Sequence, residues 1–445
     1  MGLNNHSVFL LNDSTVKAVG SNSNGQCGVG SITPTNQLAL YLIPSLNNVK
    51  QIACGTSYTI FLLSDGTVKT IGSNGFGQCG TGNITTPQLT LYAIPSLTNV
   101  KQIACGSAFS VFLLNDGTVK TIGDNSFGQC GNSATTGTNQ LTLFTIPSLT
   151  NVKSVSCGSS HLVFLLNDGT VKTVGRNFFG QCGTGTTTTQ TVPFIMPGLT
   201  NVKQVVAGNG HSVFLLNDGT VKTIGQNDGG QCGTGNTTTP QLSLYTIPSL
   251  TNVKSISCGA YHNVFLLNDG TIKTVGQNDS GQCGTGNTTT PQLTLYTIPS
   301  LSNVKQISCG QSNSIFLLND NTVKAIGYNN YGQCGNGSTN AVQLTLYTIP
   351  SLIIKCLWDN VLIIIIKYLI KQYSAYYSIK STYYDGSNYK PLTLTGGSVP
   401  NKADIELYGF DSINDLNTSI TIGSETFKPI NKLLNIFSIK EYISK

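Results

Sequence analysis

The residues of this chain that could do chemistry are its histidines, cysteines and aspartates, and almost all of them recur at regular intervals. The histidines share one position of a repeat, and other copies carry Tyr58, Phe109 or Asn313 there. A catalytic base would not be present four times and be replaced elsewhere by phenylalanine, so we predict a structural role for all four. They are His6, His161, His211 and His262.

The cysteines follow the same rule. Seven of the thirteen lie in Gly-Gln-Cys-Gly segments, five precede a glycine elsewhere in the repeat, and the last is Cys356. The chain has no Cys-x-x-Cys pair and no histidine at the spacing of a zinc site, so we predict neither a metal nor another cofactor. Small, buried, apolar side chains are the expected role. The odd count and the lack of a signal peptide favour a reduced intracellular compartment, the cytoplasm or the nucleus.

Seven aspartates, among them Asp168 and Asp218, lie in predicted hairpin turns, where Asp is favoured because its side chain bonds to the turn backbone. No Ser/His/Asp or paired-carboxylate arrangement remains outside the repeat. The glycines form neither a phosphate loop nor a dinucleotide-binding fingerprint. The sequence therefore predicts a protein that is not an enzyme and has no catalytic residue.

The elements that must position these residues repeat with the Gly-Gln-Cys-Gly segment, which occurs seven times at intervals of 50 to 52 residues. Such a period is typical of solenoids and propellers. In the fifth copy, residues 202–207, 212–217, 220–227 and 241–248 show strand patterns between turn residues, and no segment of the first 350 has a convincing helical period. Four-stranded sheets arranged radially hide their edges by repetition. We therefore predict an all-β fold, a seven-bladed β-propeller of four-stranded blades over residues 1–357, with a small C-terminal accessory module over 358–445.

The pattern Cys-Gly-x-x-His-Ser-Val-Phe-Leu-Leu-Asn-Asp-Gly-Thr-Val-Lys-Thr-Ile-Gly-x-Asn-x-x-Gly-Gln-Cys-Gly, as at residues 207–233 with Ala207 in place of the first Cys, resembles the repeat of the regulator of chromosome condensation family. The resemblance covers residues 3 to about 357 and implies a seven-bladed propeller. Family members include a nucleotide-exchange factor for a small GTPase, chromatin binders and interaction modules. The chain departs from the family pattern where Ile or Val replaces an aromatic before Gly-x-Asn and where Cys replaces Leu in Gly-Gln-Leu-Gly. Both departures are expected to be core substitutions.

The first blade lacks its first strand in the sequence, because residues 6–11 match the second strand of the other copies. Residues 353–357 follow the last blade as a first strand should. We expect this segment to complete blade one and so to latch the ring.

Variation between repeats is concentrated at one end of the blades, the top, where the loops between strands one and two and between strands three and four emerge. Aromatic side chains in exposed loops are candidate anchors for a protein partner. Folding inward over the channel mouth is the alternative. The candidates are Tyr58, Phe76, Phe109, Phe127, Phe178, Phe179, Tyr261 and Tyr331.

Lysines before residue 360 occupy two repeat positions, the start of strand one and the start of strand three, both near the opposite end, the bottom. Fourteen lysines there face seven turn aspartates, and such a face could hold a polyanion. The unequal charge of the two faces would also suit head-to-tail stacking. Pairing of each lysine with a turn aspartate is the alternative. The candidate polyanion ligands are Lys69, Lys120, Lys172, Lys222 and Lys273.

The sequence favours a non-enzymatic scaffold for protein–protein interaction, self-assembly or structural assembly. A small-GTPase exchange factor is one alternative, although the uniform repeat spacing leaves no room for an inserted wedge. Chromatin or nucleic-acid binding is another, although the chain has one arginine and no basic arm. A virion surface or fibre protein is a third, because the near-identity of repeats five and six and the Asn/Ile/Lys/Thr-rich composition resemble repeat proteins of giant DNA viruses of amoebae.

After residue 352 the composition changes, and the accessory module is expected to serve assembly or attachment. Residues 404–410 and 419–430 have strand patterns, and 431–444 could form an amphipathic helix. The apolar run at 361–366 is too short to span a membrane, so no membrane span is predicted.

Overall fold

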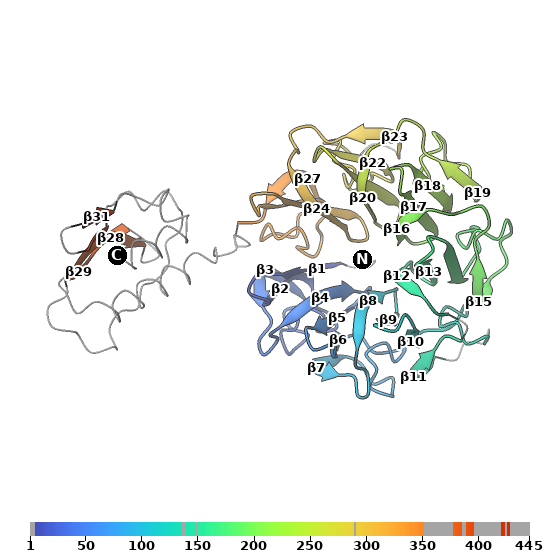
Figure 1. Cartoon of the computed structure of the whole chain (residues 1–445), viewed down its shortest axis with the longest axis horizontal. Helices are drawn as coiled ribbons and strands as arrows, with labels where there is room; N and C mark the ends of the chain where they lie inside the picture. The colour runs from blue at the N-terminus through green and yellow to red at the C-terminus, as the bar shows by residue number, and fades with distance from the viewer. Residues whose placement is uncertain are drawn as a thin grey trace. The chain divides into compact units, whose positions relative to one another are not determined.

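The structure is a computed structural model that describes residues 5–134, 139–147, 149–288, 291–350, 377–384, 389–395, 420–422 and 425–427. The chain divides into two compact units, Met1–Ile353 and Ile354–Lys445. Seven antiparallel sheets are arranged around a central axis in the first unit (Figure 1), which confirms the predicted seven-bladed β-propeller. All described elements of the chain are β-strands.

Each complete blade has its four strands in chain order, with the first strand nearest the axis (Figure 1). Blade two comprises β4 (Val49–Cys54), β5 (Tyr58–Leu63), β6 (Val68–Gly72) and β7 (Gln88–Ala93). Blade three comprises β8 (Val100–Cys105), β9 (Phe109–Leu114), β10 (Val119–Gly123) and β11 (Gln140–Thr145). Blade four comprises β12 (Val152–Cys157), β13 (His161–Leu166), β14 (Val171–Gly175) and β15 (Gln190–Ile195).

The remaining complete blades repeat this order. Blade five comprises β16 (Val202–Ala207), β17 (His211–Leu216), β18 (Val221–Gly225) and β19 (Gln241–Thr246). Blade six comprises β20 (Val253–Cys258), β21 (His262–Leu267), β22 (Ile272–Gly276) and β23 (Gln292–Thr297). Blade seven comprises β24 (Val304–Cys309), β25 (Asn313–Leu318), β26 (Val323–Tyr328) and β27 (Val342–Thr348).

The hairpin between the second and third strands shows why the sequence turns where it does. In blade five, Gly219 has a φ of +85°, which favours glycine. Asp218 Oδ1 accepts hydrogen bonds from the backbone N–H of Thr220 at 2.9 Å and from its hydroxyl at 2.8 Å. The Asp–Thr pair therefore fixes the turn, as expected from the sequence.

The core is divided among the blade interfaces. Buried apolar residues form seven clusters, one between each pair of neighbouring blades. Between blades two and three, for example, Ile60 and Leu62 of β5 pack with Ile103 of β8. Phe9 of blade one packs with Val323 and Ala325 of blade seven, so side-chain packing closes the ring of blades.

Blade one differs from the others. It contains β1 (His6–Leu10), β2 (Val16–Ser21) and β3 (Asn36–Leu42), and no described strand lies at its innermost position. A cavity of about 100 Å³ is found between β1, β4, β24 and β25, lined by residues that include Val8, Ile52, Ser308 and Ile315. The blade-one strand predicted at 353–357 lies outside the described residues, so this closure stays a prediction.

Residues that line this cavity are less buried than the corresponding residues of the other blades. Ile52 is half-buried and Ser308 is exposed, whereas the corresponding Ile103 and Ser257 of the other blades are buried. The innermost strands β4 and β24 thus each have one side that the described neighbours cover less completely than in the other blades.

The second unit contains β28 (Tyr377–Tyr384), β29 (Tyr389–Thr395), β30 (Ile420–Ile422) and β31 (Glu425–Phe427), in the sheet order β29-β28-β30-β31. β30 and β31 fall within residues 419–430, for which the sequence predicts strand. β28 and β29 were not anticipated from the sequence. The strand expected at 404–410 and the helix expected at 431–444 lie outside the described residues.

Candidate interaction surfaces

The top loops between the third and fourth strands are held by a buried asparagine and the Gly-Gln-Cys-Gly segment. In blade two, Asn74 Oδ1 accepts from the Cys79 backbone N–H at 3.0 Å, and its Nδ2 donates to the carbonyl oxygens of Asn83 and Thr85, each at 3.1 Å. Gln78 Oε1 accepts from the backbone N–H of Phe76 at 2.9 Å. Similar bonds recur in the other blades, so the loops form a fixed platform for the residues before each Gly-Gln-Cys-Gly segment.

The cysteines of these segments contribute to the same platform. Cys79 Sγ donates to the Ser73 carbonyl oxygen at 3.3 Å, and burial raises the pKa of its thiol to about 12. The cysteines of the described part of the chain are all free thiols, and all are buried except the half-buried Cys54. Their burial agrees with the small core side chains expected from the sequence.

Arg176, which directly follows β14, is surrounded by three phenylalanine rings of blades three and four. Its guanidinium carbon lies 5.3 Å from the ring centroid of Phe127, 4.9 Å from that of Phe178 and 5.7 Å from that of Phe179. The rings of Phe127 and Phe178 meet edge to face with their centroids 5.5 Å apart. Both geometries are favourable, so the two blades share one preformed cation–aromatic cluster on the top face.

The predicted top-face aromatics differ in exposure. Phe178 is 48% exposed and Phe76 is 43% exposed. Phe127 and Phe179 are half-buried. Gly210 lies in blade five, next to the Phe179 ring of blade four. A Cβ atom at position 210 would lie 2.8 Å from Phe179 Cδ2, so only glycine leaves room for the ring.

Two further predicted residues lie in other blades and are half-buried. The Tyr261 hydroxyl accepts a hydrogen bond from Asn209 Nδ2 at 2.6 Å. Tyr331 meets Tyr328 edge to face, with the ring centroids 6.0 Å apart. These tyrosines do not belong to the Arg176 cluster.

The prediction that Tyr58 and Phe109 are partner-binding residues of the top face is wrong, because both side chains are completely buried. Each is the first residue of a second strand, where its ring packs into the interface with the next blade. The Tyr58 hydroxyl donates to the carbonyl oxygen of Phe109. Neither side chain is available to a partner on the top face.

Arg176 was not among the candidates, although the sequence contained a signal. It is the sole arginine of the chain, and two phenylalanines follow one residue later. What the sequence could not show is the third ring, Phe127, which reaches the cluster from the neighbouring blade.

The histidines join neighbouring blades. His161 Nε2 lies 3.0 Å from the Ser212 hydroxyl oxygen, and that hydroxyl donates to the Gln181 carbonyl oxygen at 2.9 Å. Because the serine proton is used in this way, the histidine must donate from Nε2, and its Nδ1 is left without a partner among the described residues. Burial lowers the pKa of His161 to about 3, so the ring is neutral. His6, His211 and His262 have the same arrangement with Thr59, Asn263 and Ser314.

On the bottom face, the five predicted polyanion ligands are all half-buried at the start of third strands. Lys273 Nζ donates to the Thr297 hydroxyl oxygen at 3.2 Å. Hydrogen bonds from Thr67, followed by a smaller contribution from the charge of Lys69, lower the pKa of Asp65. These lysines therefore lie beside the turn aspartates, and their role as polyanion ligands stays a prediction.

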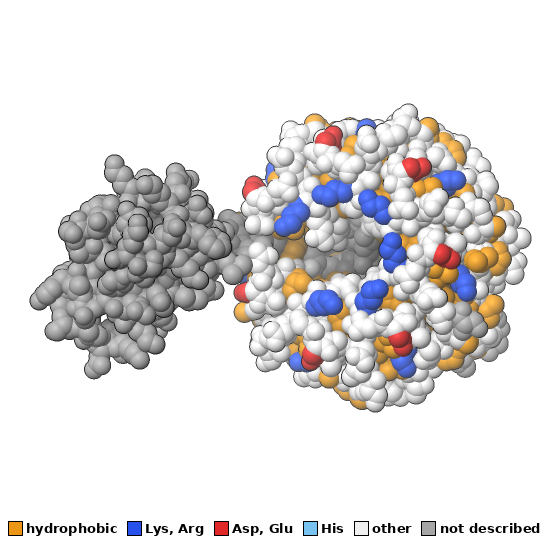
Figure 2. All heavy atoms as spheres, in the orientation of Figure 1, with side chains coloured by type: hydrophobic (Ala, Val, Ile, Leu, Met, Phe, Trp, Pro, Cys, Tyr) orange, Lys and Arg blue, Asp and Glu red, His pale blue; other side chains and the backbone are white. Residues whose placement is uncertain are grey.

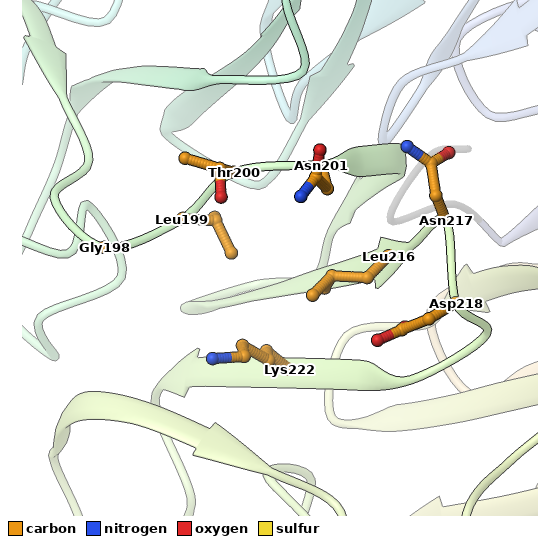
Figure 3. Close-up of a pocket in the computed structure, with 8 residues that line it drawn as sticks. All are labelled: Gly198, Leu199, Thr200, Asn201, Leu216, Asn217, Asp218 and Lys222. Carbon is orange, nitrogen blue, oxygen red and sulfur yellow. The ribbon is translucent and has the colours of Figure 1, made fainter.

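One of them, Lys222, lines a bottom-face pocket of about 290 Å³. Figure 3 shows Lys222 and Asp218, from the β17–β18 hairpin, together with the link Gly198–Asn201 that leads into β16. Gly198 stands where other links carry a serine such as Ser96 or Ser249. The pocket thus combines one cation, one anion and a polar link at the surface.

Among the described residues, no group of three or more His, Cys, Asp or Glu side chains is arranged to hold a metal ion. Within the same ranges, no helix is long and apolar enough to cross a membrane.

The fold is that of a seven-bladed β-propeller. A family model described as the RCC1-like domain matches residues 3–299 and, in an overlapping match, residues 145–365. The chain belongs to this family.

Individual relatives match the chain over different lengths. The Ultraviolet-B receptor UVR8 of Arabidopsis thaliana is 28% identical over 346 residues, which cover 75% of this chain and 77% of the receptor. The X-linked retinitis pigmentosa GTPase regulator homolog of Caenorhabditis elegans is 33% identical over 146 residues, or 30% of this chain and 10% of that protein. The human Probable E3 ubiquitin-protein ligase HERC6 is 33% identical over 195 residues, or 41% of this chain. The matched segments span only 10% and 18% of the lengths of these last two relatives.

Solved structures show the same fold. Human WBSCR16 superposes with a TM-score of 0.68 at 22% identity, covering 75% of this chain and 94% of that chain. Prp20p from Saccharomyces cerevisiae superposes with a TM-score of 0.68 at 19% identity, covering 78% of this chain and 87% of that chain.

Proposed function

We propose that this RCC1-like propeller is a non-enzymatic scaffold that binds a protein partner through an aromatic sector of its top face. The sector consists of Phe76 in blade two, Phe127 in blade three, and Arg176, Phe178 and Phe179 in blade four. The observation that carries the proposal is the Arg176 cluster, in which a cation and three rings are already arranged around the exposed Phe178.

Physical chemistry supports this assignment in two ways. Aromatic residues, phenylalanine among them, and arginine are enriched in protein interfaces relative to the rest of the surface. Rings that are held in place before binding lose little conformational entropy when a partner docks, because edge-to-face packing and the cation already restrict them. The top loops carry these residues on a hydrogen-bonded platform rather than on long free segments.

The partner's identity is a separate question. For the yeast relative Prp20p, the solved structure is reported together with binding to Gsp1p and histones. A small GTPase or a histone is accordingly the alternative kind of partner for this chain. Against exchange activity stands the uniform repeat length, which leaves no inserted wedge to displace a nucleotide. No observation favours the virion role.

Comparative affinity capture from the native source tests the proposal. The bait is the full chain as wild type, as the double variant Phe127→Ala/Phe178→Ala, and as the control Ile195→Ala, which truncates a similarly exposed apolar side chain on the outermost strand β15. We expect a partner that binds wild type and the control equally. Each phenylalanine change should weaken its binding by about 1–3 kcal/mol, roughly 5- to 150-fold in Kd. Equal capture by wild type and the double variant would contradict the proposal.

A further inference from the structure

Six lysines surround the central opening on the bottom face of the propeller. Each is the second residue of an innermost strand and is exposed, while the valine before it is at most 3% exposed. The strand register therefore directs every one of these lysines outward. Figure 2 shows basic side chains encircling the opening on this face. The ring comprises Lys50, Lys101, Lys153, Lys203, Lys254 and Lys305.

No acidic side chain of the described propeller belongs to the innermost strands or to the links before them. The turn aspartates have the third-strand lysines as neighbours. For example, hydrogen bonds from Thr118, and to a lesser extent the charge of Lys120, lower the pKa of Asp116. The other three aspartates of the propeller lie in top loops, and the sequence has no glutamate before Glu406. The positive charge of the inner ring is therefore not neutralised locally.

Neutral hydrogen-bond donors accompany the ring. An exposed pair of Thr, Ser or Asn residues in the link between blades precedes the valine before each lysine, such as Thr98 and Asn99 before Val100 and Lys101. Neighbouring ring positions are close, since Lys203 Nζ lies 3.4 Å from the Lys254 carbonyl oxygen. Hydroxyl and amide groups beside ammonium groups are suitable donors for phosphate oxygens.

The arrangement of charge restricts the size of the ligand. Several ammonium groups around one opening attract an anion that concentrates its charge in a small area. The turn aspartates join second to third strands, so they lie farther from the axis than the ring, as the acidic side chains in Figure 2 do. A long duplex would place phosphates over those carboxylates, whereas a compact anion would stay within the ring. We propose that the lysine ring binds a compact soluble polyphosphate of the inositol polyphosphate class.

Calorimetric titration with inositol hexakisphosphate tests this proposal on the full chain. The ring variant is Lys101→Gln/Lys203→Gln/Lys305→Gln, and the matched control is Lys69→Gln/Lys120→Gln/Lys222→Gln, which removes the same net charge from the third-strand lysines of the same face. All six positions are solvent-exposed or half-buried, so we expect both variants to remain folded, and thermal unfolding is the measurement that checks this. At about 0.15 M salt we expect the ring variant to bind about tenfold or more weakly than wild type, and the control within about threefold. Absence of wild-type binding, or equal losses in both variants, would overturn the proposal.

A duplex DNA of about 20 base pairs is the second probe. We expect it to bind more weakly than inositol hexakisphosphate at the same salt concentration, because its phosphates extend over the aspartates. Tighter binding of the duplex, reduced equally by the ring and the control variants, would show an extended nucleic-acid surface instead of a compact site.

Discussion

At the scale of single residues, each buried histidine contacts a polar side chain of the next blade. The histidine is the first residue of the second strand in its blade, and its partner is the second residue of the corresponding strand in the next blade. His161 meets Ser212, and the corresponding pairs around the ring are also polar. Where the first position is Phe109, the second is the apolar Leu162 of the same buried cluster. This pair of positions can therefore be polar or apolar, provided that the two contacting side chains are of the same kind.

This pairing makes propeller stability depend on pH. Burial lowers the pKa of His6, His161 and His262 to about 3 and that of His211 to about 4, from 6.5. Below pH 6.5 the unfolded chain takes up protons that the folded chain does not, so stability is complete above pH 6.5 and falls between pH 6.5 and the folded-state values. The loss approaches about 1.4 kcal/mol per histidine for each pH unit. Urea unfolding at pH 7.5, 6 and 5 measures it.

The double variant His161→Phe/Ser212→Leu copies the Phe109/Leu162 pair and serves as the matched control. It should remain folded at pH 7.5 and lose about a quarter of the pH dependence, because one of the four histidines is gone. A pH dependence equal to that of wild type would show that acid sensitivity arises elsewhere.

Thiol chemistry gives a second prediction at this scale. Buried thiols with raised pKa values react slowly, so a thiol reagent should modify few cysteines of the native protein. In denaturant without reductant, about thirteen should react, the full number in the sequence. Two or fewer reactive thiols after unfolding would reveal disulfides and contradict the predicted reduced state.

The sequence predicted residue roles wherever the repeat itself supplied the comparison. Phenylalanine at a histidine position argued against catalysis, and cysteine in every Gly-Gln-Cys-Gly segment argued for the core. Tyr58 and Phe109 occupy the repeat position of the four histidines, so the repeat carried a signal for their burial, which the structure shows. The repeat could not associate Phe127 with Arg176, because that contact depends on how two neighbouring blades pack.

At the scale of elements, the innermost position of blade one is the main departure from repetition. Blade one has three described strands where the other blades have four, and a cavity of about 100 Å³ lies beside β1. Residues 353–357 remain the predicted occupant. Deleting residues 353–445 should therefore destabilise blade one, whereas deleting 365–445 should leave the propeller as resistant to limited proteolysis as wild type. Equal resistance of the two truncated chains would rule out the latch.

Strands and turns of the propeller were predictable because apolar alternation and the Asp–Gly–Thr turn recur in every blade. β28 and β29 were not, because the second unit has no internal repeat against which a short tyrosine-rich strand could be recognised.

At the scale of the propeller as a whole, the two faces have different chemistry. The top carries an aromatic sector organised by the sole arginine, together with exposed Asp228 and Asp279 in blades five and six. The bottom carries exposed lysines around the opening and turn aspartates farther out (Figure 2). A repeat fold thus presents distinct surfaces because the lysines and turn aspartates of the bottom recur in the blades, whereas the top-loop residues before each Gly-Gln-Cys-Gly segment vary from blade to blade.

Site-specific photo-crosslinking tests the central claim, that the top aromatic sector binds a protein, most directly. p-Benzoylphenylalanine replaces Phe178 on the top face, Ile195 on the outermost strand or Thr98 on the bottom face, each an exposed position. After illumination in the native source, we expect a protein adduct from position 178 that is absent from positions 195 and 98. Adducts from position 98 without any from position 178 would contradict the account.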